Sequence, residues 1–405
     1  MSTEYRSRPH GNASGGPRSL LRTAAVACAA VLATFTIAAC GSSSGSSSAS
    51  GSSASGSSAS GSSASGQGVN KEAAQKAIAP YIGQTSAFPI SEPLSKPVPA
   101  GTQFAYLQCG TQNCAFAGQI VNSAVKALGG TLTTINSGAT AATAQAAASS
   151  VLTLKPAALI LAGIDPRQYG DSLQKISAAG IKIVSISVSV DTKPFGITAN
   201  YLGAQTFQLV GRLMADWVVA NKGANANVAF YSVPEITFTP IMAKAFEEEL
   251  TKNCSSCKVR NVSIGVATLG TTAPRTVVTD LQSHRNTNVA VFSVADLASG
   301  VPAAMSAAGL STTTVVYSPG PGNLQDIKNG KATVGLAIDF ASSIWVAVDV
   351  AARLIEGGQP TASEQAGDAS FQFLGQKDIT FDPSHGWLAY PDYQQRFTKL
   401  WHPAG

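Results

Sequence analysis

From residue 100 onward, apolar positions cluster in short runs, and polar and apolar positions alternate with helical spacing between those runs. Nearly continuous apolar runs are typical of strands in a parallel sheet that is covered on both faces. They predict strands at 103–108, 131–136, 157–161, 181–187, 228–231, 259–264, 289–292, 315–317 and 333–338.

The segments between these strands have the length and spacing of helices. They predict helices at 115–128, 141–153, 168–178, 203–220, 241–251, 274–283, 297–308 and 342–356. Strict strand–helix alternation favours a doubly wound α/β fold, and a body of roughly 300 residues favours two lobes over one core. The preceding segment, 69–99, predicts a short helix at 71–78 and then a proline-rich extended arm that lies on the first lobe.

The N-terminal segment has the pattern of an export signal. Arg18 and Arg22 precede an apolar run that ends at Ile37-Ala38-Ala39-Cys40, and this run is shorter than the roughly 20 residues that span a bilayer. The four residues resemble the lipobox of bacterial lipoproteins. The resemblance implies removal of residues 1–39 and lipidation of Cys40, the alternative being an ordinary secretory signal with a chance cysteine.

Residues 40–68 follow as an almost pure Gly, Ser and Ala stretch that repeats the pentad GSSAS. Such a composition cannot bury a core, so it predicts a flexible tether with a root-mean-square reach of about 30 Å. Together with a lipidated Cys40, the tether indicates an extracytoplasmic protein that is anchored to the cell membrane.

The charge balance argues against nucleic acid as a partner. The 39 residues before Cys40 carry four arginines and one glutamate, so 23 of the 27 basic and 21 of the 22 acidic residues remain after cleavage. The remaining chain is close to neutral and has no basic stripe with interleaved aromatic residues.

Four cysteines remain after cleavage and lipidation, and three pairings are open to them. An oxidising compartment and the short spacings favour the local disulfides Cys109–Cys114 and Cys254–Cys257. A redox pair at Cys254/Cys257 and a zinc site are the alternatives. No histidine or third thiol near either pair completes a zinc site, so we expect no metal.

The order of the elements and the local sequence of several segments resemble those of the type I periplasmic solute-binding proteins of ABC importers, the ribose-binding-like group. The matching stretches are SAVKALGGTLTTINSG, AALILAGIDPRQYGDSLQKISAAGIKIVSI, NVAVFSVADLASGVPAAMSAAG and DIKNGKATVGLAID. They cover about residues 100–360.

The resemblance implies a Venus-flytrap of two doubly wound parallel-sheet lobes. The N-terminal lobe would comprise 100–201 and 339–365, and the C-terminal lobe 202–338 and 366–401. Three crossings, near 199–201, 338–340 and 364–368, would form the hinge. A small molecule would bind between the lobes, and hinge closure would present the protein, as a monomer, to an ABC transporter permease.

The chain departs from the polar residues with which sugar-binding relatives hold their ligand. A pyranose clamp is therefore not expected, although a sugar-binding import lipoprotein remains the alternative. Small or apolar residues stand at the positions of the family's Asp-Arg pair, helix arginine, asparagine, aspartate and glutamine: Ser187-Val188, Met242, Ala295, Ser318 and Ile338.

The same loops provide a candidate site for a compact ligand with an apolar body and one or two polar groups. Its aromatic and apolar walls would be Phe116, Phe238, Met242, Tyr317 and Phe340, and its polar points Gln112, Asn113, Asp165, Ser187, Thr239, Asp296, Ser318 and Asp339. Plain core packing is the alternative for each apolar residue, and helix capping is the alternative for Asp165 and Asp296.

We expect neither catalysis nor a cofactor. The chain holds four histidines, and no GxSxG, HExxH or SxxK pattern lies in a suitable strand–helix context. The PGPG at 319–322 lacks the following Lys-Ser/Thr of a phosphate loop and reads as a turn. A ligand-presenting sensor component for a membrane receptor remains open beside the importer.

Overall fold

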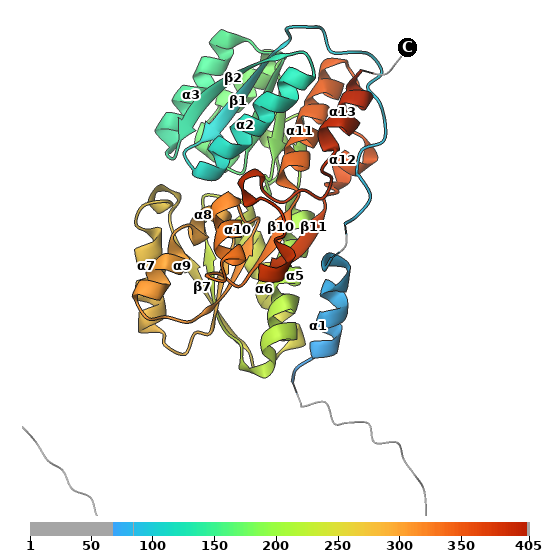
Figure 1. The fold of residues 1–405 in the computed structure, drawn as a ribbon. Helices are drawn as coiled ribbons and strands as arrows, with labels where there is room; N and C mark the ends of the chain where they lie inside the picture. The colour runs from blue at the N-terminus through green and yellow to red at the C-terminus, as the bar shows by residue number, and fades with distance from the viewer. Residues whose placement is uncertain (1–67, 84, 403–405) are drawn as a thin grey trace, which may run out of the picture. The chain divides into compact units, whose positions relative to one another are not determined.

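The computed structural model describes residues 68–83 and 85–402, which form two α/β lobes (Figure 1). Cys40, the segment before it and nearly all of the predicted tether lie outside the described residues. Within the described ranges, no helix combines the length and the apolar character needed to cross a membrane.

The first lobe has a five-stranded parallel sheet in the order β2-β1-β3-β4-β5. The inner strands are buried except at one or two positions each, whereas most residues of the edge strand β2 are exposed or half-buried. The strands are β1 (Gln103–Cys109), β2 (Thr131–Gly138), β3 (Ala158–Ala162), β4 (Lys182–Ile186) and β5 (Ala199–Tyr201).

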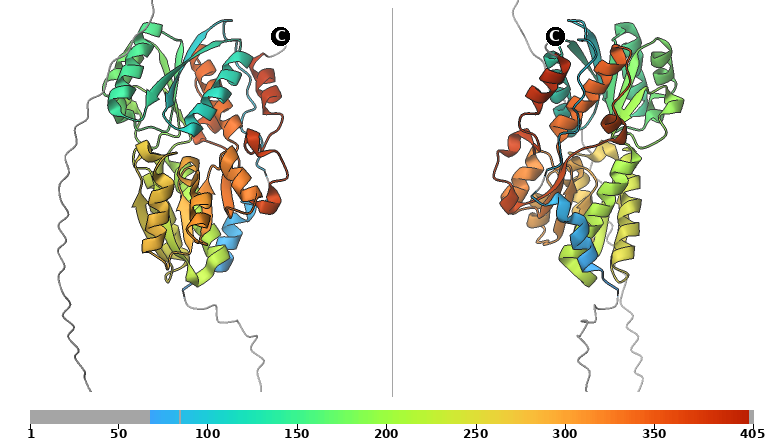
Figure 2. Two further views of the ribbon diagram at one scale, coloured as in Figure 1. Left: turned by 60° about the vertical axis from the view of Figure 1, so that its left-hand side comes forward. Right: turned by 90° about the vertical axis from the view of Figure 1, so that its right-hand side faces the viewer.

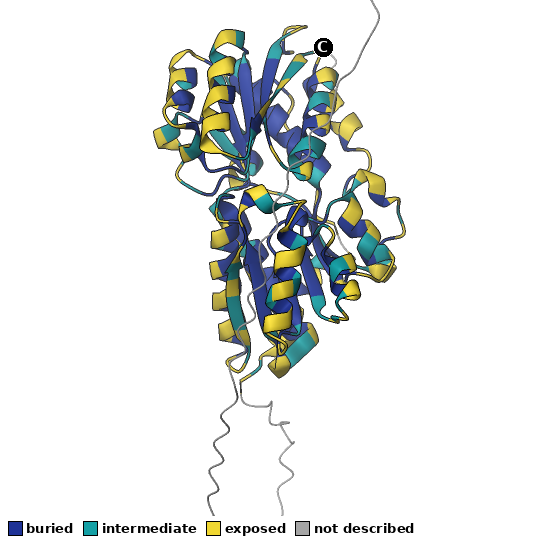
Figure 3. Cartoon of the chain, turned by 90° about the vertical axis from the view of Figure 1, so that its left-hand side faces the viewer, coloured by how far each residue is buried: buried dark blue, intermediate teal, exposed yellow. Residues whose placement is uncertain are grey.

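Helices cover both faces of this sheet. α2 and α11 pack together on one face, and α3 and α4 pack on the other. Figure 3 shows the resulting layers, with buried strands inside and the exposed sides of the helices outside. The helices are α2 (Gln112–Ala127), α3 (Ala141–Leu154), α4 (Ser172–Ala178), α11 (Phe340–Ile355) and the short α12 (Ala362–Ala366).

The second lobe has a six-stranded sheet in the order β11-β10-β9-β8-β6-β7. All neighbours are parallel except β11, which pairs antiparallel to β10 at the edge and was not predicted. The strands are β6 (Asn227–Ser232), β7 (Lys258–Ser263), β8 (Val289–Phe292), β9 (Thr313–Tyr317), β10 (Val334–Ile338) and β11 (Phe371–Gly375).

α5 and α6 pack tightly against each other in this lobe, because Gly211 of α5 leaves no room for a side chain: a Cβ there would lie 2.4 Å from the carbonyl oxygen of Met242. The remaining helices include α10, which starts inside the PGPG stretch that was read as a turn. The helices are α5 (Ala204–Lys222), α6 (Phe238–Asn253), α7 (Ala273–Ser283), α8 (Ala295–Ala298), α9 (Val301–Ala307) and α10 (Pro321–Lys328).

The chain passes between the lobes at the three predicted places: after β5, after β10 and before β11. A fourth passage, residues 376–392, was not predicted. It returns the chain from β11 to α13 (Tyr393–Trp401), which packs on α11 of the first lobe. The ring of Trp401 stacks on that of Trp345 at 5.0 Å, so the end of 366–401 lies with the first lobe and not with the second.

The arm before residue 100 also differs from its prediction. α1 (Lys71–Ile78) packs on α5 of the second lobe (Figure 2), where Val69 forms a β-bridge with Cys254. The proline-rich stretch then runs to the first lobe and is held there at Leu94, whose amide donates to the carbonyl oxygen of Leu400. The arm therefore contacts both lobes.

Candidate ligand-binding site

A cavity lies between the lobes, where the carboxyl ends of strands from both sheets meet. Its empty volume is about 760 Å³, part of which is open to solvent. Ligand pockets occur at this edge of open α/β sheets. Its position, with lining from both lobes, marks the cavity as the candidate site.

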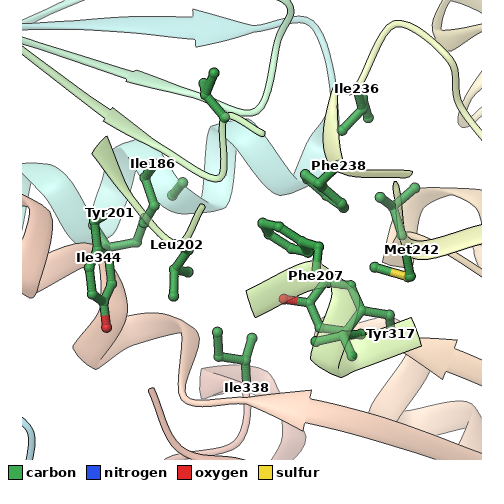
Figure 4. Close-up of a cluster of buried hydrophobic side chains, with 14 of the residues drawn as sticks. Ile186, Tyr201, Leu202, Phe207, Ile236, Phe238, Met242, Tyr317, Ile338 and Ile344 are labelled. Carbon is green, nitrogen blue, oxygen red and sulfur yellow. The ribbon is translucent and has the colours of Figure 1, made fainter. Parts of the chain in front are cut away.

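Apolar side chains form most of the cavity wall (Figure 4). Ile186, Leu202 and Ile344 come from the first lobe, and Phe238 and Tyr317 come from the second. Each of the first-lobe residues lies near a strand end or on α11, so the sheet fixes its position. A wall of this kind favours a ligand with an apolar body.

A second layer of aromatic residues supports this wall. The ring of Phe207 stacks on that of Phe238 with 4.1 Å between the ring centroids, and Tyr317 meets both rings edge-on. Met242 is fully buried and does not line the cavity. The rings that face the cavity are therefore held by packing from behind.

Three cavity residues have a left-handed backbone that side chains other than glycine seldom adopt. Ser187, Leu202 and Ser318 have φ values of 63°, 59° and 49°. The amide of Ser187 donates to the carbonyl oxygen of Tyr201 at 2.8 Å, which holds this turn in place. Strained backbone persists where the surrounding structure over-determines it, and it clusters at binding sites.

Several polar groups at the cavity have no hydrogen-bond partner among residues 68–83 and 85–402. They are the side chains of Asn113, Ser187, Ser318 and Tyr317. Burial raises the pKa of Tyr317, so its phenol is neutral and is able to donate or accept. These groups are available to a ligand.

Asp296 is the charged side chain of the cavity. Its Oδ1 accepts a hydrogen bond from the backbone amide of Asn113 across the lobes at 3.3 Å. Burial raises the pKa of Asp296, and contacts with the Asn113 amide and the Thr111 hydroxyl oppose part of that shift. Asp296 thus lies at the positive N-terminal end of α2, which belongs to the other lobe.

Both predicted disulfides are present, Cys109–Cys114 and Cys254–Cys257. The first joins the end of β1 to the first turn of α2, and both of its residues line the cavity. Thr111 lies inside this loop and caps α2 by accepting from the Cys114 amide at 3.3 Å. The loop that carries Asn113 is therefore fixed covalently as well as by capping.

The lobes also touch directly beside the cavity. Ile164 of the first lobe and Ile236 of the second form a β-bridge. The amide of Asp165 donates to the carbonyl oxygen of Glu235, and the amide of Thr237 donates to that of Gly163, both at 3.3 Å. The two lobes thus contact each other through backbone groups beside the cavity.

The structure brings together Asn113, Ser187, Phe238, Asp296, Tyr317 and Ser318 from the sequence-based candidates. Gln112 is exposed and outside the cavity, and Phe116 stacks on Phe340 at 6.0 Å in a smaller adjoining recess. Of these two rings, only Phe340 also lines the main cavity.

Three further polar candidates have structural partners. Asp165 caps a short 3₁₀ turn and forms an ion pair with Arg167, in line with the capping alternative for this residue. Thr239 is fully buried and bonds through its hydroxyl to the Val233 backbone. Asp339 caps α11, and it also accepts from the amides of Ala389 and Tyr390.

The sequence reading missed most of the aliphatic wall, although a signal was present for Ile186, Leu202 and Ile338, which end or directly follow a strand. The missed residues are Ile164, Ile186, Leu202, Ile236, Ile338 and Ile344.

Comparison with known proteins places this fold in a family. The profile of the "periplasmic binding protein domain" matches residues 109–359. No curated protein sequence matches significantly.

Solved structures share the fold at low sequence identity. An ABC sugar transporter subunit from Rhodobacter sphaeroides 2.4.1 is 18% identical with a TM-score of 0.59, over 69% of this chain and 99% of that one. A 5-methylthioribose transporter solute-binding protein from Thermotoga lettingae TMO, solved with 5-methylthioribose, is 15% identical with a TM-score of 0.62, over 74% and 99%. An Agrobacterium vitis solute-binding protein with bound allitol is 17% identical with a TM-score of 0.60, over 69% and 97%. The domain profile spans more than half of the chain, and the protein therefore belongs to the periplasmic binding protein family.

Proposed function

We propose that this protein is a membrane-anchored, extracytoplasmic solute-binding protein that captures a compact, partly apolar small molecule between its lobes and delivers it, as a monomer, to an ABC import permease. The observation that carries the proposal is the cavity of about 760 Å³, which residues of both lobes line at the carboxyl ends of their strands. A ligand there contacts both lobes at once and so favours the closed form.

The lining supports a ligand other than a typical pyranose. Sugars are held by bidentate polar side chains that cost free energy when they are left unpaired. Here no lysine, arginine or histidine lines the described cavity, and its polar groups are a carboxylate, an amide and hydroxyls. The aromatic wall of Phe238 and Tyr317 suits a ring or a branched apolar group.

The anchor and the delivery step rest on sequence and family. Cys40 follows a signal-like segment and precedes a Gly/Ser tether, which supports lipidation and attachment to the membrane surface. Membership of the periplasmic binding protein family supports an extracytoplasmic location. The resemblance to the binding proteins of ABC importers implies an ABC permease as the partner.

A thermal-unfolding screen of the full chain tests the ligand class. The panel would contain sugars, polyols, amino acids, aromatic acids and alicyclic compounds. A ligand at a hundred times its dissociation constant stabilises the folded state by about 2.7 kcal/mol. We expect stabilisation by ring compounds and none by hexoses or pentoses. Stabilisation by sugars alone would overturn the proposed ligand class and restore the sugar importer.

A further inference from the structure

The charge of the cavity is one-sided. Among the residues that line it, Asp296 is the acidic one, and the described lining contains no basic side chain. Asp296 is 9% exposed, so water solvates it poorly. A poorly solvated carboxylate is costly unless a partner offsets its charge.

Two other buried carboxylates of the chain have such partners. Asp349 pairs with Arg353 at 2.7 Å, and Asp339 accepts three backbone hydrogen bonds at 3.0–3.2 Å. Asp296 accepts one backbone hydrogen bond, from Asn113 at 3.3 Å, contacts the Thr111 hydroxyl and forms no ion pair within the described residues. It is therefore the least compensated of these three groups.

The N-terminus of α2 offsets only part of this charge. A helix end carries the equivalent of roughly half an elementary charge. The cavity therefore keeps a net negative potential when Asp296 is ionised.

Two independent features of the wall point the same way. Phe238, Tyr317 and Phe340 line the same cavity, and aromatic faces attract cations. The Tyr317 hydroxyl has no partner in the described part of the chain although the residue is only 4% exposed, so an acceptor faces the ligand space. Figure 4 shows Tyr317 on the same side of the cavity as Phe207 and Phe238.

We propose that the cavity selects an organic cation, namely a compact ring or branched hydrocarbon with an ammonium group that pairs with Asp296. This inference rests on the proposed function, since it names the charge of the ligand at the same site. The ammonium would replace the missing partner of the carboxylate in a charge-assisted hydrogen bond, while the hydrocarbon contacts the apolar wall.

Three probes of nearly the same shape test the proposal on the full chain at neutral pH: cyclohexylammonium, cyclohexanol and cyclohexanecarboxylate. D-glucose is the fourth probe. Dissociation constants come from titrating each probe against the unfolding midpoint. We expect cyclohexylammonium to bind at least tenfold more tightly than cyclohexanol, and cyclohexanecarboxylate to bind most weakly.

Variants assign the preference to one side chain. Asp296→Asn should remove the preference for cyclohexylammonium over cyclohexanol, whereas Asp296→Glu should retain it. The matched control is Asp171→Asn, which removes the same charge from an exposed side chain at the N-cap position of α4 in the first lobe. The unfolding midpoint of each variant without ligand verifies that it folds. If Asp296→Asn does not fold, the order of the probe dissociation constants on the wild type still tests the preference for the ammonium.

The outcomes separate the two proposals. Equal or tighter binding of cyclohexanol by the wild type would overturn the cation and leave the apolar-ligand binding protein standing. Binding of D-glucose alone would overturn both the cation and the apolar ligand class. If none of the four probes shifts the unfolding midpoint at millimolar concentration, the proposed selectivity for an organic cation would be contradicted, because cyclohexylammonium is a small member of that class.

Discussion

The carboxylate of Asp296 in the second lobe accepts a hydrogen bond from the backbone amide of Asn113 in the first lobe at 3.3 Å. This bond links the two lobes directly, and both of its residues line the cavity. The same side chain therefore joins the two lobes and lines the space between them.

Shortening one ring of the aromatic wall should weaken ligand binding. Phe238 faces the cavity and stacks on Phe207, so Phe238→Leu removes ring contacts on both sides. Aromatic pairs contribute about 0.5–1.5 kcal/mol, which predicts a loss of roughly twofold to tenfold in affinity for a ring ligand. Calorimetric titration measures it. Phe373→Leu is the control, because that ring packs on Trp217 away from the cavity; an equal loss there would contradict the assignment.

The two disulfides should have different effects on binding. Replacing Cys109 and Cys114 together by serine should cost about 2 kcal/mol of unfolding free energy in the chain-entropy model. It should also weaken ligand binding, because the loop that carries Asn113 is then no longer fixed before the ligand arrives. Urea unfolding and ligand titration measure the two effects.

Cys254 and Cys257, replaced together by serine, serve as the matched control. This disulfide lies at the turn between α6 and β7, and neither residue lines the cavity. We expect a loss of stability without a change in affinity. An unchanged affinity in the Cys109/Cys114 variant would contradict the prediction, because ligand binding would then not depend on the disulfide that fixes the Asn113 loop.

Buried carboxylates should make the protein more stable in mildly acidic solution than in alkaline solution. Burial raises the pKa of Glu364 to about 8 from 4.5, with Asp349 adding to the shift, and burial raises the pKa of Asp339 to about 6 from 3.8. Since folding raises these pKa values, their contribution to stability is complete below the unfolded values. It is lost as pH rises through about 6 and about 8.

Unfolding free energy should accordingly increase as pH falls from about 9 to about 6. Glu364→Gln should flatten the alkaline part of this dependence, because glutamine cannot ionise. Glu248→Gln is the control at an exposed position of α6. A stability profile that rises with pH over this range, or a Glu364→Gln profile identical to wild type, would refute the prediction.

The last helix should be essential to the first lobe. Trp401 is fully buried, stacks on Trp345 of α11 and donates through Nε1 to Asp349 Oδ1 at 2.5 Å. Trp401→Ala should lower the unfolding free energy by about 3–5 kcal/mol, as for other buried aromatic residues. Chemical unfolding measures the loss, and a cost below 1 kcal/mol would mean that α13 does not belong to the core of this lobe.

The alternation of apolar runs and helical spacing was enough to predict two sheets and most of their strands, because each inner strand is buried on both faces. It missed β11, whose sequence FQFLG alternates less clearly and pairs antiparallel at an edge. It also missed α10, because prolines and glycines at 319–322 indicate a turn although Pro321 is the first residue of the helix.

The candidate site was predicted in part. Strand-end positions located Asn113, Ser187, Asp296 and Ser318 correctly at the cavity. Met242 was included because it stands at the position of the family's helix arginine, but it is fully buried and does not line the cavity. The partners of Asp339 come from residues 50 positions away and more, and no local pattern reports such contacts.

The most direct test of the account fills the cavity. Ala162 lies at the end of β3 and lines the cavity, so Ala162→Phe should occupy the ligand space, and Ala146→Phe on the exposed face of α3 is the matched control. The panel compound that most stabilises the wild type would be titrated calorimetrically into all three proteins. The account predicts one-to-one binding to the wild type and to Ala146→Phe, and at least a hundredfold weaker binding to a folded Ala162→Phe. Equal affinity in all three would contradict it, because the ligand would then bind outside the space between the lobes.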